Sequence, residues 1–91
     1  MIAARSQIVR AAESIPANIA EGYGRGIISG DGARFLTVAR ASAAELESHL
    51  RVAQASERLD WARAQALILQ TREVRYLVHR LLVSVRLRLS H

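Results

Sequence analysis

A chain of 91 residues fits a single domain, because polypeptides divide into several cores only above roughly 250 residues. Hydrophobic residues make up 51% and charged residues 23%, which excludes a disordered composition, and the absence of cysteine excludes disulfides, thiolate metal sites and cysteine nucleophiles. All basic residues except the histidines are Arg, and the net charge of +5 permits an acidic partner such as nucleic acid.

The amino-acid composition favours helix over sheet, since Ala, Leu and Arg dominate and only one Pro and five Gly occur. We therefore expect an all-α protein, with one helical bundle domain over residues 1–91. Its apolar runs are too short for a membrane-spanning helix or the core of a signal peptide. The chain is expected to be soluble and cytoplasmic, with no membrane partner.

The first predicted helix covers residues 2–22, where Ile8, Ala12, Ile15 and Ile19 fall on one stripe. Pro16 interrupts this pattern, because proline lacks the donor of a helical hydrogen bond. Two backbone arrangements are compatible with Pro16. Either Ser14 caps a new helix that has Pro16 in its first turn, or one helix kinks there.

A polar ridge accompanies the apolar stripe, since Ser14, Asn18 and Glu21 follow one another at helical spacing. The ridge could bind a ligand. It could also satisfy backbone groups freed by Pro16 or pair across a helix interface, and we favour this structural interpretation because one carboxylate lacks a second acid or a base.

All five glycines lie in the segment 22–32, which predicts a loop between two helices. Gly22 is expected to end the first helix. The spacing of the glycines does not match a phosphate-binding motif, and no strand is predicted before it, so the segment is interpreted as a plain connection.

The second predicted helix covers residues 33–56, with Asp31 as its N-cap. Its apolar face is expected to carry Phe35, Ala39, Ser42, Leu46, Leu50 and Ala53, and its far side Arg40, Glu47 and Arg51. Glu45 and Glu47 point to different sides, so they do not form a carboxylate pair for acid–base catalysis.

The third predicted helix covers residues 61–89, with Asp60 as its N-cap. Its apolar face is expected to comprise Leu67, Val74, Leu77, Val78, Leu81 and Val85. A basic stripe on the opposite side contains Arg72, Arg75, His79 and Arg86, beside Tyr76. The basic stripe is either a solvated face that keeps the bundle in solution or a surface for nucleic acid.

Two segments carry a resemblance to a known family: SIPANIAEGYGR at residues 14–25 and FLTVARASAAELESHL at residues 35–50. Together they resemble the four-helix bundle proteins, also known as the 23S ribosomal-RNA intervening-sequence proteins. The residues that match the two family motifs are Ser14, Pro16, Asn18, Glu21, Gly22 and Arg25, then Phe35, Leu36, Ala39, Ser42, Glu45, Leu46 and Glu47. They are motif or interface positions to which the family attaches no catalytic role.

The resemblance implies an up-and-down helical bundle that assembles into a homo-oligomeric ring, typically a pentamer. Related members are the accessory variability proteins of diversity-generating retroelements, whose basic barrels bind reverse transcriptase and nucleic acid. Members of the family have a further helix ahead of the segment that begins here at Ser6, so three of four helices are expected in this chain. A late start codon, a truncated gene or a genuine three-helix variant would each explain the difference.

These observations together predict a non-enzymatic, self-associating bundle whose basic surface binds RNA, DNA or a protein that handles nucleic acid, such as a reverse transcriptase. The alternative is a purely structural oligomer or a protein adaptor without a nucleic-acid role. No cofactor is expected. No metal is expected either, since His49, His79 and His91 share no short ligand spacing.

Overall fold

The computed structural model describes the backbone of residues 2–90 and the side chains of residues 6–90, so His91 lies outside the described part. Three helices form: α1 (Ile2–Gly24), α2 (Gly30–Ala55) and α3 (Trp61–Leu89). No strand occurs among residues 2–90, which confirms the predicted all-α class. The third helix has the predicted bounds, whereas the loop between the first two is shorter than predicted, because α1 continues through Gly22 and α2 begins at Gly30.

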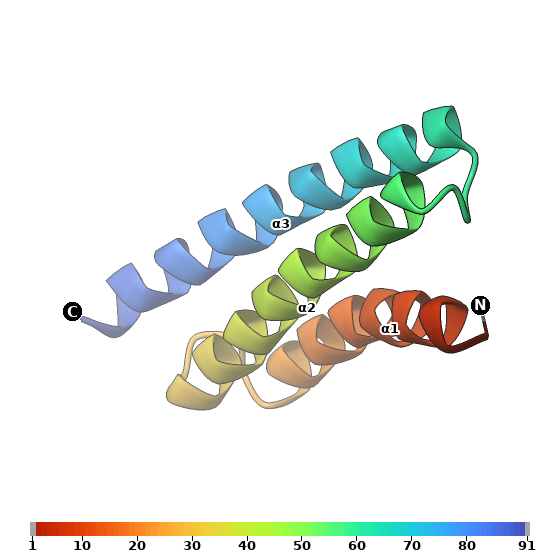
Figure 1. Cartoon of the computed structure of the whole chain (residues 1–91). Helices are drawn as coiled ribbons and strands as arrows, with labels where there is room; N and C mark the ends of the chain where they lie inside the picture. Colours follow the sequence, from red (N-terminus) through yellow and green to blue (C-terminus); the bar gives the residue numbers. More distant parts are fainter. Residues whose placement is uncertain (1, 91) are drawn as a thin grey trace.

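The helices run up and down, and α2 lies between α1 and α3 (Figure 1). Within the described part of the chain, α1 and α3 each pack closely on α2 but their backbones do not approach one another. The Cα atoms accordingly span 48 × 21 × 13 Å, so the molecule is long and thin. One side of the bundle between α1 and α3 is left without a covering helix.

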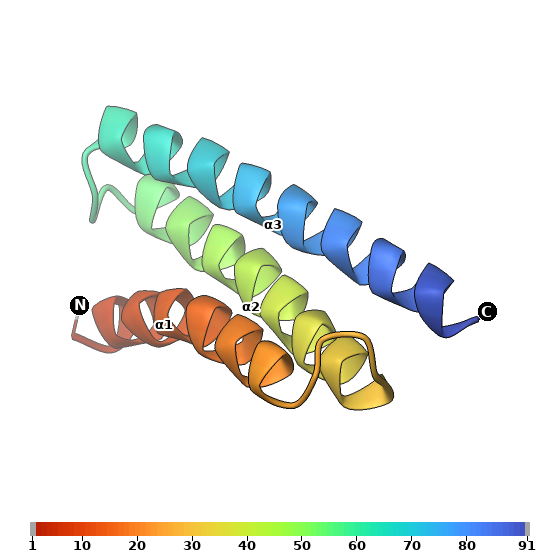
Figure 2. The same ribbon diagram turned by 180° about the vertical axis from the view of Figure 1, so that it is seen from behind.

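Pro16 lies inside α1 and does not begin a new helix, so Ser14 is not an N-cap. Figure 2 shows the axis of α1 changing direction near its middle, as expected where a proline removes a helical donor. The side chain of Asn18 donates a hydrogen bond to the Ser14 carbonyl at 2.7 Å. A polar side chain thus supplies a hydrogen bond to the backbone next to the proline.

The connection between α1 and α2 is held by a serine and two glycines. Ser29, not Asp31, is the N-cap of α2, because its hydroxyl accepts a hydrogen bond from the Gly32 backbone N–H at 2.9 Å. Gly26 adopts φ +86°, a left-handed conformation that suits glycine at the end of a helix. Gly22 therefore does not end α1; its missing side chain leaves room for Ile27 and Phe35.

The face of α2 that meets its neighbours contains the predicted residues but is wider, because Leu36 and Ala43 are also fully buried. Ala39, Ser42, Leu46, Leu50 and Ala53 are buried, and Phe35 is half-buried. On α1 the contact is shifted by one residue at its centre, since Ala11 and Ile15 are buried while Ala12 is exposed. The core consists of two connected clusters, one centred on Ile15, Leu46 and Ile68 and the other on Leu36, Leu82 and Val85.

The buried face of α3 differs from the predicted one. The residues buried against α2 are Ala64, Ile68, Thr71, Val78, Leu82 and Val85. Only Val78 and Val85 were expected among them, whereas Leu67, Val74 and Leu77 are 44%, 38% and 55% exposed. The reason is that α3 packs on α2 along the border between its apolar and basic stripes, which lets small Ala64 and Thr71 sit at the contact.

This orientation leaves an apolar surface uncovered, which we call the open face: Ile19 on α1 with Leu67, Val74, Leu77 and Leu81 on α3. Ile19 and Leu81 are both half-buried and pack against the same cluster, which consists of Leu36, Leu82 and Val85, so α1 and α3 present apolar side chains to the same side of α2. Apolar surface that stays exposed on a small protein marks a partner or self-association site.

Candidate nucleic-acid interface

The packing of α3 decides where the basic stripe lies. Since the contact with α2 runs along the border of the two stripes, the basic residues of α3 lie beside α2 and not on the side away from it. Three residues of α2 therefore become neighbours of the basic stripe: Arg40, Glu47 and Thr37. The prediction that Arg40 and Glu47 occupy an exposed far side of α2 is wrong for this reason, because α3 packs next to that side.

Glu47 is the acidic residue of this contact. Its side chain is only 13% exposed, and its carboxylate accepts a hydrogen bond from Arg51 Nε at 2.9 Å. Arg75 Nη1 of α3 lies 3.3 Å from the other oxygen, Oε1, which is close enough for an ion pair but lacks hydrogen-bond geometry. Arg75 is thus partly neutralised within the protein and is a weaker anion contact than its place in the basic stripe suggested.

Arg40 joins the basic stripe from α2. Its Nη1 atom lies 2.9 Å from Nδ1 of His79. Arginine carries donors only, so Arg40 donates and His79 accepts, which requires an imidazole without a proton on Nδ1. The bond fixes both side chains at the surface between the helices and leaves the other nitrogens of Arg40 for a further acceptor.

The two remaining members of the stripe have different surroundings. Arg86 Nη2 lies 3.5 Å from the Thr37 hydroxyl, at the limit of hydrogen-bond distance. Arg72 is exposed and has no ion-pair partner within residues 6–90. Within residues 6–90, Arg40, Arg72 and Arg86 thus form no ion pair with a carboxylate, in contrast to Arg75.

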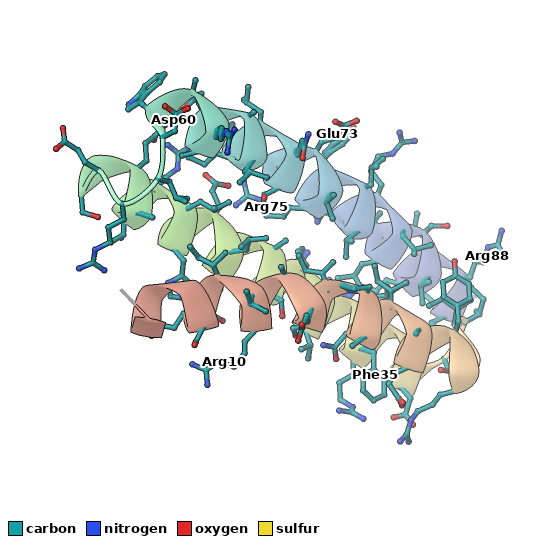
Figure 3. All side chains as sticks on the ribbon, turned by 90° about the vertical axis from the view of Figure 1, so that its right-hand side faces the viewer. Arg10, Phe35, Asp60, Glu73, Arg75 and Arg88 are labelled. Atoms are coloured by element: carbon teal, nitrogen blue, oxygen red, sulfur yellow. The ribbon has the colours of Figure 1, made fainter. Side chains whose placement is uncertain are left out.

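An open hollow of about 550 Å³ lies on this surface. Its lining residues, all from α2 and α3, are Arg40, Leu69, Arg72, Glu73, Arg75, Tyr76 and His79. Figure 3 shows Arg75 beside the α2–α3 contact and Glu73 on the outer side of α3. The arrangement brings three arginines and an imidazole to one concave surface, which suits a polyanion.

The family motif residues lie elsewhere, at the contact of α1 with α2. The hydroxyls of Ser14 and Ser42 are 2.8 Å apart, and Asn18 Nδ2 donates to Ser14 Oγ at 3.0 Å. Of the interpretations open for the polar ridge, this geometry corresponds to pairing across a helix interface. Glu21 does not take part in it, since its carboxylate lies 3.5 Å from Arg25 Nε in the exposed loop region.

Two further motif residues, Arg25 and Phe35, lie where the chain passes from α1 to α2. The guanidinium of Arg25 lies 5.2 Å and that of Arg34 4.4 Å from the centre of the Phe35 ring. Such cation–π contacts hold an otherwise mobile arginine against an aromatic face. Glu45 is 65% exposed and pairs within α2 with His49 at 3.4 Å, on the opposite side from Glu47.

Among the described side chains no group of His, Asp and Glu could hold a metal ion. No helix over residues 2–90 is long and apolar enough to cross a membrane.

The 23S rRNA-intervening sequence protein family matches residues 2–80, most of the chain. The protein belongs to this family. Comparisons with curated proteins and with solved structures gave no match. The family match includes the motif contacts of α1 and α2 and the part of α3 that carries Arg72, Arg75, Tyr76 and His79, whereas Arg86 lies beyond it.

The sequence alone pointed to the basic stripe of α3 but missed Arg40. An arginine at position 40 is one of several on α2, and only the angle at which α3 packs makes it a neighbour of His79. One signal in the sequence could have pointed to Arg40. Arg40 and Glu47 are two helical turns apart and therefore lie on the same side of α2.

Proposed function

We propose that this member of the 23S rRNA-intervening sequence protein family is a non-enzymatic, self-associating bundle that binds nucleic acid through the α2–α3 surface. The observation that carries the proposal is the convergence of Arg40, Arg72, Arg75 and His79 on one open hollow. The family name links its members to ribosomal RNA genes, which supports RNA as the first ligand to test.

The test is binding of fluorescently labelled RNA and DNA across a series of salt concentrations. Phosphate contacts release counterions, so the affinity is expected to fall steeply as salt rises. The variant that combines Arg40→Gln and Arg72→Gln is expected to bind weakly, with a salt slope lower by about one unit for each phosphate that the variant no longer neutralises.

The matched control combines Arg10→Gln and Arg58→Gln, which removes the same charge from two exposed positions outside the hollow. It is expected to keep most of the affinity and the slope. Equal losses in both variants would show that only net charge matters and would refute a defined site. If the wild type binds neither RNA nor DNA at about 50 mM salt, the nucleic-acid function is wrong and the protein-adaptor alternative replaces it.

Self-association is supported by the accessible surface of the chain. A compact monomer of 10.0 kDa is expected to expose roughly 5,200 Å², whereas this chain exposes 6007 Å². The excess of about 800 Å² is similar to the area that each partner buries in a standard protein interface. We propose that copies of the chain associate through the open face, and the pentameric ring implied by the family is one form of such an assembly.

Light scattering at micromolar concentration tests this second part. A mass above that of one chain is expected, and a single 10 kDa species would refute self-association. A dimer or tetramer would reject the pentamer alone.

A further inference from the structure

A second open hollow lies on α3 next to the first. It has a volume of about 620 Å³, and the residues around it are Tyr76, His79, Arg80, Val83, Ser84, Leu87 and Arg88. Tyr76 and His79 belong to both hollows, so the Tyr76 side chain stands on the ridge between them. The basic stripe therefore has an aromatic residue at its centre.

Tyr76 is available to a ligand. Its side chain is 58% exposed, and its only cation–π contact within residues 6–90 is with the Arg80 guanidinium, 5.9 Å from the ring centre. Leu69, Val83 and Leu87 in the same hollows are 55%, 40% and 58% exposed. The surface thus alternates arginines with apolar and aromatic side chains.

This pattern fits the chemistry of a single strand better than that of a duplex. A duplex presents phosphates and hides the faces of its bases, so apolar side chains between the arginines would gain little from it. A single strand offers base faces that stack on aromatic rings and a backbone that arginines follow. We propose, on the basis of the proposed nucleic-acid function, that Tyr76 is a stacking platform for the bases of single-stranded nucleic acid.

The spacing of the charges along α3 supports this arrangement. Arg72, Tyr76 and Arg80 succeed one another at intervals of four residues, which places each about 6 Å further along one side of the helix. A cation therefore lies on either side of the ring, where the phosphates that flank a stacked base can reach it. Arg40, which is bonded to His79, adds a cation from α2 to the first hollow, and Arg88 adds one to the second.

Glu73 at the edge of the first hollow also favours contact with a base over contact with the phosphates of a second strand. Its carboxylate repels phosphate but accepts hydrogen bonds from the amino groups of bases. Those amino groups lie on the Watson–Crick edge, which is free in a single strand and paired in a duplex.

The experiment compares four labelled oligonucleotides of equal length: a single-stranded RNA without internal pairing, the duplex of the same RNA, an abasic RNA and a single-stranded DNA. The single-stranded RNA is expected to bind at least roughly five-fold more tightly than the duplex and the abasic strand, because one stacked base contributes at least that factor. The DNA arm shows whether the 2′-hydroxyl contributes.

The Tyr76→Leu variant is expected to lose about the same factor for the single strands and to bind the abasic RNA as the wild type does. Tyr76→Phe keeps the aromatic face and should retain the affinity. Tyr23→Leu is the matched control, since Tyr23 is 56% exposed on α1. Circular dichroism of the variants confirms that the helices remain.

Equal binding of single strand, duplex and abasic RNA, or an unchanged affinity in Tyr76→Leu, would overturn the stacking platform and leave nucleic-acid binding itself in place. Absence of binding to all four oligonucleotides at about 50 mM salt would overturn both proposals.

Discussion

A single glycine in the first turn of α2, Gly32, limits which side chains the chain can accept at that position. A Cβ atom added at Gly32 would collide with the backbone carbonyl of Ile27 and approach that of Gly26. A backbone cannot move aside as the end of a flexible side chain can. Gly32 also donates its N–H to the Ser29 hydroxyl, so the same residue takes part in the N-cap of α2 and permits the loop to lie against the helix.

Gly32→Ala is therefore expected to destabilise the protein by about 1–3 kcal/mol, the range for an overpacked site. Chemical denaturation followed by circular dichroism measures the change. Gly24→Ala is the control, because a Cβ there meets no atom within 4 Å and α1 ends at this residue. The control should be neutral or slightly stabilising, since alanine favours helix. Equal stability of the two variants would contradict the proposed collision.

At the scale of elements, the contact between α2 and α3 combines a close apolar packing with one nearly buried carboxylate. Two small residues, Ala43 of α2 and Ala64 of α3, are fully buried and let the helices approach. Glu47 lies at the edge of that contact between Arg51 and Arg75. The ion pair holds a basic residue of α3 against α2 and lowers the positive charge available to a ligand.

Glu47→Gln is expected to act on stability and binding in opposite directions. Loss of the carboxylate should lower the free energy of unfolding by about 1 kcal/mol. This is less than a buried hydrogen bond between charged groups contributes, because both arginines are partly exposed to solvent. Arg75 is then free to contact phosphate, so RNA affinity should rise and its salt slope should become steeper. Denaturation curves and fluorescence anisotropy measure the two effects.

Glu45→Gln is the control for charge alone, because Glu45 is 65% exposed and lies on the other side of α2. Glu45→Gln changes the net charge by the same amount as Glu47→Gln. If both variants raise RNA affinity by the same factor, the specific role given to the Glu47–Arg75 pair is wrong.

For the whole molecule, the decisive feature is that the backbones of α1 and α3 each approach only α2 within the described part of the chain, and α1 and α3 share no close backbone contact. Three helices packed in this way cannot surround their own apolar residues. The open face of Leu67, Val74, Leu77, Leu81 and Ile19 is the consequence, and it lies on the flank of α3 opposite the basic stripe. Self-association and nucleic-acid binding can therefore take place on different sides of α3.

Two leucines of equal exposure allow this separation to be tested. Leu77 on the open face and Leu69 in the first hollow are both 55% exposed. Leu77→Gln is expected to lower the mass of the assembly in light scattering, because it places an amide in the apolar interface. Leu69→Gln should leave the mass unchanged. The reverse result, or no change from either, would show that association does not use the open face.

The sequence by itself determined the helices, because their signals are local. Apolar periodicity and the Asp60 cap give α3 its observed bounds, and the buried face of α2 follows from residues spaced along one stripe. The family motifs at Ser14 to Arg25 and Phe35 to Leu50 likewise lie in continuous segments. The N-cap of α2 was missed because Ser29 and Asp31 both have capping side chains and only the loop path distinguishes them.

Only the tertiary structure decided how the stripes of α3 are used. Hydrophobicity favours burial of Leu67, Val74 and Leu77, yet the contact with α2 uses Ala64 and Thr71 beside Ile68. The two small side chains allow close approach of the helices. That rotation of α3 joins Arg40 to His79 and occupies Arg75 with Glu47. The candidate site depends on residues of two helices 39 positions apart, and no local pattern encodes the angle at which those helices meet.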